Sequence, residues 1–159
     1  MDDNFNDFES IPNLVSMFLS RAELRGDRPF LGYKHGDEWR TISWAETARR
    51  VAGLAKALKD MGLKKGDRVM LVSENRPEWC IADLGIMAAG CVTVPTYVTN
   101  TERDHQHILD NSQSRAVIVS TAKLAQQLMP AVIRSSECEF VIGMEPLKVS
   151  QRGQQKHHD

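Results

Sequence analysis

One glycine pair in this sequence of 159 residues has a spacing associated with phosphate chemistry. Gly85 and Gly90 are as far apart as the two glycines of the P-loop that binds nucleotide phosphates. That loop also needs a lysine and then a serine or threonine, because backbone N–H groups and a fixed positive charge must surround the phosphates. Cys91 and Val92 follow instead, and no G-x-G-x-x-G motif occurs. The pair therefore predicts no phosphate site.

The potential metal ligands of the sequence are poorly spaced for a metal site. His105 and His107 lie two positions apart, and such residues point to different sides of a helix, unlike the i, i+4 histidines of zinc proteases. Cys80, Cys91 and Cys138 show no C-x-x-C spacing and lie in apolar surroundings. We expect a solvated helix face for the histidines, reduced buried cysteines, and no metal site.

Three carboxylates lie around the segment that begins at Pro77. Glu74, Glu78 and Asp83 could act as general acid and base if two of them faced a shared cleft. Alternatively, they interact with the positive end of a helix dipole near Pro77. The second interpretation is preferred because no His, Ser or Cys nucleophile has a matching spacing. No catalytic residue is predicted.

The three tryptophans also allow two interpretations. Trp39, Trp44 and Trp79 could form a stacking platform for bases, but no basic patch is interleaved with them. Large aromatic side chains supply much of the buried area in a domain of this size, so core packing is the preferred interpretation.

The N-terminal elements that would carry these residues are predicted from periodicity and capping. Apolar residues at helical spacing indicate a helix over Leu14–Gly26, which the glycine ends. Two strand-like runs within 30–42 indicate a hairpin. Ser43 and Glu46 have the spacing of a capping box, and the helix that they open is expected to stop at Gly62.

A regular alternation of strand-like and helix-like segments follows. Strand-like runs begin near Arg68, Val92, Ala116 and Phe140, twenty-four residues apart, which leaves room for a helical crossover between parallel strands. Helix starts are expected at Pro77, at Thr101 with Asp104, and at Ser120 or Thr121, with Pro130 interrupting the last helix. The predicted fold is a three-layer α/β architecture, a mostly parallel sheet flanked by helices, with a small N-terminal hairpin.

Composition limits the class of protein. The chain is 42% hydrophobic and 26% charged with a formal net charge of -1, which is typical of a globular domain and favours neither nucleic acid nor an anionic membrane as a partner. The most apolar stretch, 81–98, carries Asp83, Gly85, Gly90 and Pro95 and is not expected to span a membrane. The acidic start lacks the features of a targeting segment, so a cytoplasmic location is predicted.

A series of short motifs resembles the N-terminal subdomain of the adenylate-forming superfamily, and within it the long-chain acyl-CoA synthetases. The motifs in order are Trp39–Trp44, Gly66-Asp67-Arg68-Val69, 73–79 (SENRPEW), Ala88-Ala89-Gly90, Val92-Thr93-Val94-Pro95, 101–105 (TERDH), 108–112 (ILDNS) and 116–119 (AVIV). The resemblance covers 10–147, which is predicted to be a partial N-terminal subdomain, and 148–159 is predicted to be a polar, disordered tail.

This resemblance implies a reaction that joins an acyl carboxylate to AMP with ATP and Mg²⁺ and then transfers the acyl group to coenzyme A. The family's phosphate loop, adenine pocket and catalytic lysine have no counterpart in these residues, so the chain is expected to be a truncated segment, inactive alone and without cofactors of its own. Thr96 and Tyr97, in the loop over 96–100, would lie near coenzyme A, in place of the glycines that some relatives have there.

Two alternatives remain open at this stage. The chain could be a standalone interaction or regulatory module derived from that family, or a small nucleotide-binding α/β domain, which the missing phosphate loop makes the weaker option. The chain is expected to be marginally stable, or else to self-associate or pair with a partner through an exposed apolar face, because the strand over 68–73 needs cover on both faces. The sequence does not indicate acyl chain length, and its end at Asp159 could be a natural terminus, a frameshift or a truncation.

Overall fold

The computed structural model of the chain describes residues 10–147. The predicted tail over 148–159 lies outside the described residues. The first helix, α1 (Leu14–Arg25), begins where the Asn13 side chain accepts a hydrogen bond from the Ser16 backbone N–H at 2.8 Å. It ends at Gly26, whose positive φ of 51° reverses the chain, as the sequence predicts.

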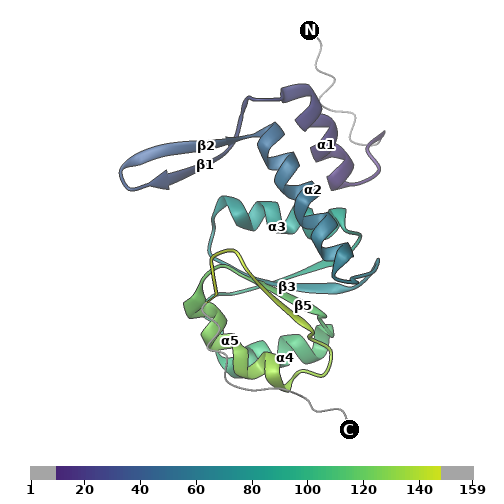
Figure 1. The fold of residues 1–159 in the computed structure, drawn as a ribbon, viewed down its shortest axis with the longest axis vertical. Helices are drawn as coiled ribbons and strands as arrows, with labels where there is room; N and C mark the ends of the chain where they lie inside the picture. Colours follow the sequence, from purple (N-terminus) through teal and green to yellow (C-terminus); the bar gives the residue numbers. More distant parts are fainter. Residues whose placement is uncertain (1–9, 148–159) are drawn as a thin grey trace.

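A hairpin and a long helix follow α1, and both were predicted. Strands β1 (Pro29–His35) and β2 (Glu38–Ser43) pair antiparallel and project from the body of the molecule (Figure 1). Helix α2 (Trp44–Asp60) begins where the Ser43 hydroxyl accepts a hydrogen bond from the Glu46 N–H at 3.1 Å. Gly62, with a φ of 89°, follows its end.

The main sheet consists of four parallel strands, which confirms the predicted direction of all of them. They are β3 (Arg68–Val72), β4 (Val92–Thr96), β5 (Ala116–Val119) and β6 (Phe140–Gly143), in the spatial order β4-β3-β5-β6. The helices between them are α3 (Pro77–Ala88), α4 (Glu102–Ser112) and α5 (Ala122–Arg134). All four strands begin at the residues that the spacing predicts.

Helices cover both faces of this sheet (Figure 1). Side chains of α2 and α3, including Leu58 and Ile86, pack against one face, and side chains of α4 and α5, including Leu109 and Leu128, pack against the other. Four residues of β3, Val69 to Val72, have no exposed surface, because alternate side chains enter the two cores. The three-layer α/β architecture is therefore confirmed.

The expected interruption of the last helix at Pro130 is wrong. Helix α5 continues through Pro130 to Arg134. A proline inside a helix removes one backbone hydrogen bond and crowds the preceding turn. The buried apolar face of α5, which includes Leu128 and Ala131 at zero exposure, holds the helix against the sheet despite this cost.

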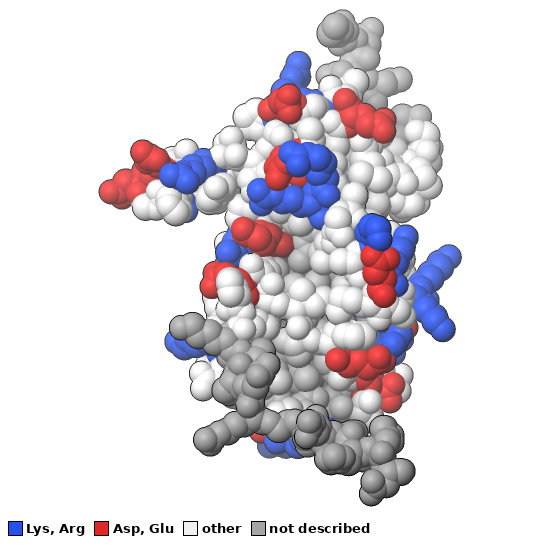
Figure 2. All heavy atoms as spheres, viewed as in Figure 1, with Lys and Arg blue, Asp and Glu red and all other residues white. Residues whose placement is uncertain are grey.

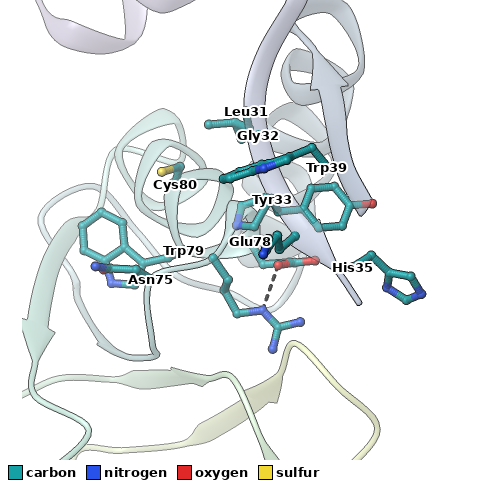
Figure 3. A pocket seen from close by; sticks show the side chains of 12 residues that line it. Leu31, Gly32, Tyr33, His35, Trp39, Asn75, Glu78, Trp79 and Cys80 are labelled. Atoms are coloured by element: carbon teal, nitrogen blue, oxygen red, sulfur yellow. Dashed lines mark hydrogen bonds and ion pairs between the residues drawn. The ribbon is translucent and has the colours of Figure 1, made fainter. Parts of the chain in front are cut away.

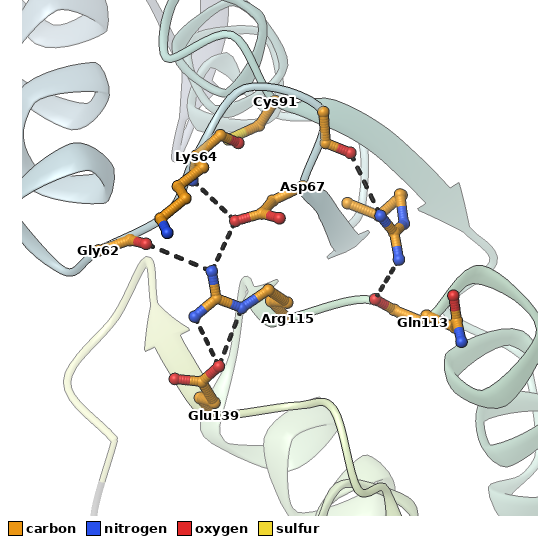
Figure 4. A network of polar contacts seen from close by, with 9 residues as sticks. Gly62, Lys64, Asp67, Cys91, Gln113, Arg115 and Glu139 are labelled. Atoms are coloured by element: carbon orange, nitrogen blue, oxygen red, sulfur yellow. Dashed lines mark hydrogen bonds and ion pairs between the residues drawn. The ribbon is translucent and has the colours of Figure 1, made fainter.

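Arg115 hydrogen-bonds to groups at the amino-terminal ends of neighbouring strands of the main sheet (Figure 4). Arg115 donates hydrogen bonds to the Asp67 carboxylate at 2.7 Å, to the Glu139 carboxylate at 2.6 and 2.9 Å, and to the Gly62 carbonyl at 3.3 Å. The Lys64 backbone N–H and the Arg115 guanidinium lower the pKa of Asp67, although partial burial opposes them. One side chain thus connects the starts of β3, β5 and β6.

Replacement of Arg115 by methionine is expected to lower the free energy of unfolding by about 1–2 kcal/mol, because the half-buried Asp67 loses a charged partner. Denaturant melts measure the loss. Arg40→Met is the matched control, since Arg40 makes only an exposed pair with Glu38 at 3.7 Å and its loss is expected to cost less than about 0.5 kcal/mol. Equal effects of the two substitutions would contradict a structural role for Arg115.

None of the helices within 10–147 is both long enough and apolar enough to cross a lipid bilayer.

Candidate functional site

The carboxyl ends of the parallel strands form the edge at which α/β sheets commonly bind ligands. The chain leaves β3 toward α3, on one side of the sheet, and leaves β5 toward α5, on the other side. The adjacent strands β3 and β5 therefore flank a topological switch point, where a crevice opens outside the strand ends. The residues that follow these two strands are the first candidates for a site.

A hydrogen bond crosses this switch point. Ser120, fully buried after β5, donates its hydroxyl proton to the carboxylate of Glu74, which follows β3. This hydrogen bond is the largest cause of a lowered pKa of Glu74. Glu74 itself is exposed, so its charge faces solvent while one oxygen is held in place.

Next to the switch point, the hairpin and the start of α3 enclose an open groove of about 850 Å³ (Figure 3). Tyr33 and Trp39 lie on the hairpin side, and Asn75 and Trp79 lie on the α3 side. Trp39 is 73% exposed, and its indole lies next to Gly32. The groove is lined by both aromatic and polar groups.

Arg76 lies between this groove and the end of β6. Its guanidinium donates hydrogen bonds to the carboxylates of Glu78 and Glu145, each at 2.8 Å. Burial alone would raise the pKa of Glu78, but the hydrogen bond from Arg76 and a backbone N–H lower it. The positive charge of Arg76 is thus shared between two carboxylates.

The predicted coenzyme A surface lies at the end of the edge strand β4. The Asn100 side-chain amide donates a hydrogen bond to the Thr96 hydroxyl at 2.6 Å, which closes the loop over 96–100. Tyr97 is 80% exposed and free to contact a ligand. The role of these two residues toward coenzyme A stays a prediction.

Family comparisons agree with this geometry. A family model described as AMP-binding enzyme matches residues 18–158. The chain belongs to the AMP-binding enzyme family. It is 32% identical over 111 residues to a long-chain-fatty-acid–CoA ligase of Mycobacterium tuberculosis, covering 68% of this chain and 18% of the relative. A long-chain-fatty-acid–CoA ligase of Xenopus laevis is 27% identical over 126 residues, covering 78% of this chain and 17% of the relative.

Solved structures of similar fold are members of the same superfamily. A benzoate CoA ligase from Burkholderia xenovorans aligns with a TM-score of 0.71 and 27% identity over 84% of this chain and 26% of that protein. The N-terminal subdomain of Klebsiella oxytoca NpsA, in complex with 3-hydroxybenzoyl-AMSN, aligns with a TM-score of 0.65 and 25% identity over 82% of this chain and 29% of that one. The chain therefore has the fold of a partial N-terminal subdomain of adenylate-forming enzymes, and it spans about a fifth of the length of these curated relatives.

Within this AMP-binding enzyme fold, two expectations from the sequence are wrong. His105 is not on a solvated helix face: it is fully buried on α4, whereas His107 is exposed. Trp39 is not a core residue, because the hairpin that carries it projects from the body. Trp44 does pack in a core, with its ring centroid 3.8 Å from that of Phe30, and Trp79 is half-buried against the α2–α3 core.

The acidic residues are held by separate partners. Glu78 lies in the first turn of α3, as the electrostatic interpretation predicts, while Glu74 is bound by Ser120. Cys91 is buried and Cys80 and Cys138 are half-buried, and burial raises the pKa of all three thiols. Within 10–147, no group of three or more side chains is arranged to hold a metal ion.

The sequence did not indicate the groove, the two ion pairs of Arg76, or the hydrogen bond from Ser120 to Glu74. The groove depends on how the hairpin lies relative to α3, which no local pattern encodes. Ser120 follows a fully apolar strand, and a polar residue directly after such a strand is the signal that could have indicated the switch point.

Replacement of Ser120 by alanine is expected to raise the pKa of Glu74 toward its ordinary value, because the hydroxyl no longer stabilises the carboxylate. The lowered pKa means that this contribution to stability is present at neutral pH and is lost as the pH falls through the folded value. NMR titration of the Glu74 carboxyl carbon measures the change. Ser73→Ala is the control, since the Ser73 hydroxyl bonds the Glu74 backbone carbonyl instead. An unchanged titration of Glu74 in the Ser120 variant would contradict the assignment.

Proposed function

We propose that residues 10–147 are the scaffold of an AMP-forming fatty-acid–CoA ligase, and that the 159 residues by themselves do not carry out its reaction. The parent reaction converts ATP, a fatty acid and coenzyme A into acyl-CoA, AMP and pyrophosphate. The observation that carries this proposal is the similarity to long-chain-fatty-acid–CoA ligases over most of the chain. ATP and Mg²⁺ would act at residues that are not among these 159.

The described residues fit a positioning role better than a catalytic one. Adenylate formation needs positive charge and N–H donors against a developing anion. Arg76 lies at the carboxyl-terminal ends of the strands, and Arg115 lies at their amino-terminal ends. Each of these arginines forms ion pairs with two carboxylates, which neutralise its charge. The sheet instead fixes the carboxyl-end loops against one another, which supports a scaffold function. A cytoplasmic location belongs to the same proposal.

The purified chain is expected to show no fatty-acid-dependent exchange of labelled pyrophosphate into ATP above a control without protein. A complete fatty-acid–CoA ligase, assayed in parallel, shows that the conditions permit the reaction. Exchange that scales with the concentration of this chain, and persists through further purification, would disprove the proposed inactivity.

Coenzyme A is proposed to contact the loop that carries Thr96 and Tyr97. The exposed Tyr97 ring can stack on the adenine, and the Thr96 hydroxyl, although it accepts from Asn100, can still donate a hydrogen bond. NMR titration with coenzyme A should shift the amide signals of these residues and not that of Trp39, which is exposed on the hairpin. Shifts confined to other loops would remove Thr96 and Tyr97 from the proposal.

A further inference from the structure

After β6 the chain turns back over the carboxyl end of the main sheet. Residues 144–147, called the strap below, follow Gly143, the last residue of β6. The Met144 N–H donates a hydrogen bond to the carbonyl of Val119, the last residue of β5, at 2.9 Å. Met144 packs against the α2–α3 core, and Leu147 packs against the α4–α5 core. Because these cores lie on opposite faces of the sheet, the strap passes from one face to the other at the carboxyl end.

An ion pair holds the middle of the strap. The Glu145 carboxylate accepts a hydrogen bond from the Arg76 guanidinium at 2.8 Å. Arg76 lies between β3 and α3, and β5 lies between β3 and β6 in the sheet. The pair therefore spans the carboxyl end of β5. In Figure 2, basic and acidic atoms lie together below the hairpin, where Figure 1 shows the yellow turn after β6 beside the start of α3.

The strap lies over one side of the switch point. Ser120, the residue after Val119, has no exposed surface although β5 has ended. The hydrogen bond from Met144 to Val119 places the strap beside it. Open α/β sheets commonly bind ligands in the crevice outside the strands that flank a switch point. The β5 side of this crevice is therefore spanned by a segment of the chain itself.

The position of the strap also depends on Gly143. A Cβ at this position would lie 2.6 Å from the Leu147 Cγ and would also clash with the Glu145 backbone carbonyl. Carbon atoms in favourable contact are about 3.5 to 4.0 Å apart, so a side chain at position 143 would displace the strap. A glycine at the end of β6 thus allows the chain to fold back closely on itself.

The strap is held less firmly than the strands beneath it. Glu145 and Pro146 are exposed, and Met144 and Leu147 are half-buried, whereas every residue of β5 is buried. The ion pair of Arg76 and Glu145 is also partly exposed. Segments with few buried apolar contacts open locally at a lower free energy than the core of the same domain. The strap can therefore detach while the sheet stays folded.

We propose that the strap is a local gate over the switch-point crevice, and that the ion pair between Arg76 and Glu145 is its latch. The structure shows the closed state. When the latch breaks, Met144 gives up its hydrogen bond to Val119 and the strap leaves the crevice, while β3 and β5 remain paired. The proposal rests on contacts within 10–147 and does not depend on the ligase function.

Native-state hydrogen exchange, followed by NMR in the full 159-residue chain, measures the opening. The Met144 amide reports on the strap. The Arg115 amide, which donates to the Arg68 carbonyl at 3.0 Å at the other end of β5, reports on the sheet. Met144 is expected to exchange faster than Arg115 but more slowly than an unstructured peptide. Exchange of both amides at one rate would show that the strap opens only with the sheet, and an unprotected Met144 would show that the strap is not held closed; either result overturns the proposal.

Glu145→Gln tests the latch, and Glu139→Gln is the matched control. The two glutamates lie on either side of β6, their side chains are 47% and 49% exposed, and each pairs with one arginine. Glu145→Gln should raise the exchange rate of the Met144 amide about two- to fivefold, the factor expected for loss of a partly exposed ion pair, and leave that of Arg115 unchanged. Glu139→Gln should leave Met144 unchanged. Equal exchange of Met144 in the two variants would overturn the assignment of the latch.

Salt and Gly143→Ala provide two further measurements. Raising the NaCl concentration from 0.1 to 1 M shortens the screening length from about 10 to about 3 Å, so it should speed exchange of Met144 in the unmodified chain but not in the Glu145 variant. Gly143→Ala should speed it by about tenfold or more, because the added Cβ displaces the strap. Gly53→Ala, with nothing within 4 Å of its added Cβ, should not. A Met144 amide that responds to neither salt nor Gly143→Ala would contradict the proposed gate.

Discussion

Replacement of Gly85 by valine is expected to destabilise the chain by about 3 kcal/mol, because α3 approaches α2 too closely at this position to accommodate a side chain. A Cβ at Gly85 would lie 2.7 Å from Leu54 Cδ2, 3.0 Å from Cγ and 3.1 Å from Cβ. Glycine in a helix interior costs about 1 kcal/mol relative to alanine. The close approach of the two helices explains why the fold needs a glycine here.

Denaturant melts of single and double variants separate the steric cause from other effects. Leu54→Ala, combined with Gly85→Val, should recover more than half of the loss, since it removes the two nearest atoms that the new side chain meets, Leu54 Cδ2 and Cγ. Gly53→Ala is the matched control: it lies in α2 with nothing within 4 Å of an added Cβ, and it should stabilise the chain by up to about 1 kcal/mol. If Gly85→Val and Gly53→Ala behaved alike, the close contact would not be the reason for the glycine.

Gly85 also shows why the role of a residue in packing two helices together cannot be predicted from sequence spacing. As a sequence feature, Gly85 is one of two glycines at the spacing of a phosphate loop. In the fold it is a point of contact between α3 and α2, and the residue that makes the contact, Leu54, belongs to another helix. Spacing identifies residues that are near in the chain, whereas this contact depends on how two helices cross.

The helices and strands could be predicted because the interactions that start and end them involve residues close together in the sequence. Thr101 and Asp104 bond each other's backbone N–H groups at 3.4 and 2.9 Å, and this reciprocal cap depends only on residues within one turn. Strands β3 and β5 are continuous apolar runs covered on both faces, and the spacing between successive strands of the main sheet is long enough for a helix, so their parallel direction also follows from sequence. The spatial order of the strands, β4-β3-β5-β6, could be known only from the structure.

The candidate site was predicted only in part, because its components come from distant segments. Thr96 and Tyr97 do lie at the carboxyl edge of the sheet, where a loop after a strand should be. The hydrogen bond from Ser120 to Glu74 joins positions 46 residues apart, and that between Arg76 and Glu145 joins positions 69 apart. Neither residue pair carries a motif that would have indicated its partner.

His105 is expected to lower the stability of the chain as the pH falls below about 6.5, the ordinary pKa of a histidine. It has no exposed surface, and neither ring nitrogen hydrogen-bonds to a described residue. Burial lowers the pKa of His105 because it disfavours the charged imidazolium, and the neighbouring Asp104 carboxylate opposes this only in part. The folded chain therefore holds His105 neutral under conditions in which the unfolded chain protonates it.

The sign of the dependence follows from which state takes up the proton. As the pH falls through the unfolded pKa of about 6.5, the unfolded chain binds a proton that the folded chain does not. The free energy of unfolding then falls by up to about 1.4 kcal/mol for each pH unit, until the pH reaches the lowered folded pKa of His105. Above the unfolded pKa this destabilisation is absent.

His105→Leu removes the titrating group and keeps the site apolar and of similar size, so it should flatten the pH dependence and leave the stability at pH 7.5 equal or higher. Urea melts at half-unit pH intervals measure the slope. His107→Leu, on the exposed face of the same helix, is the matched control and should retain the slope of the unmodified chain. Because carboxylates titrate mainly below pH 5, a slope that persists in the His105 variant would have to come from another histidine and would show that burial of His105 is not its cause.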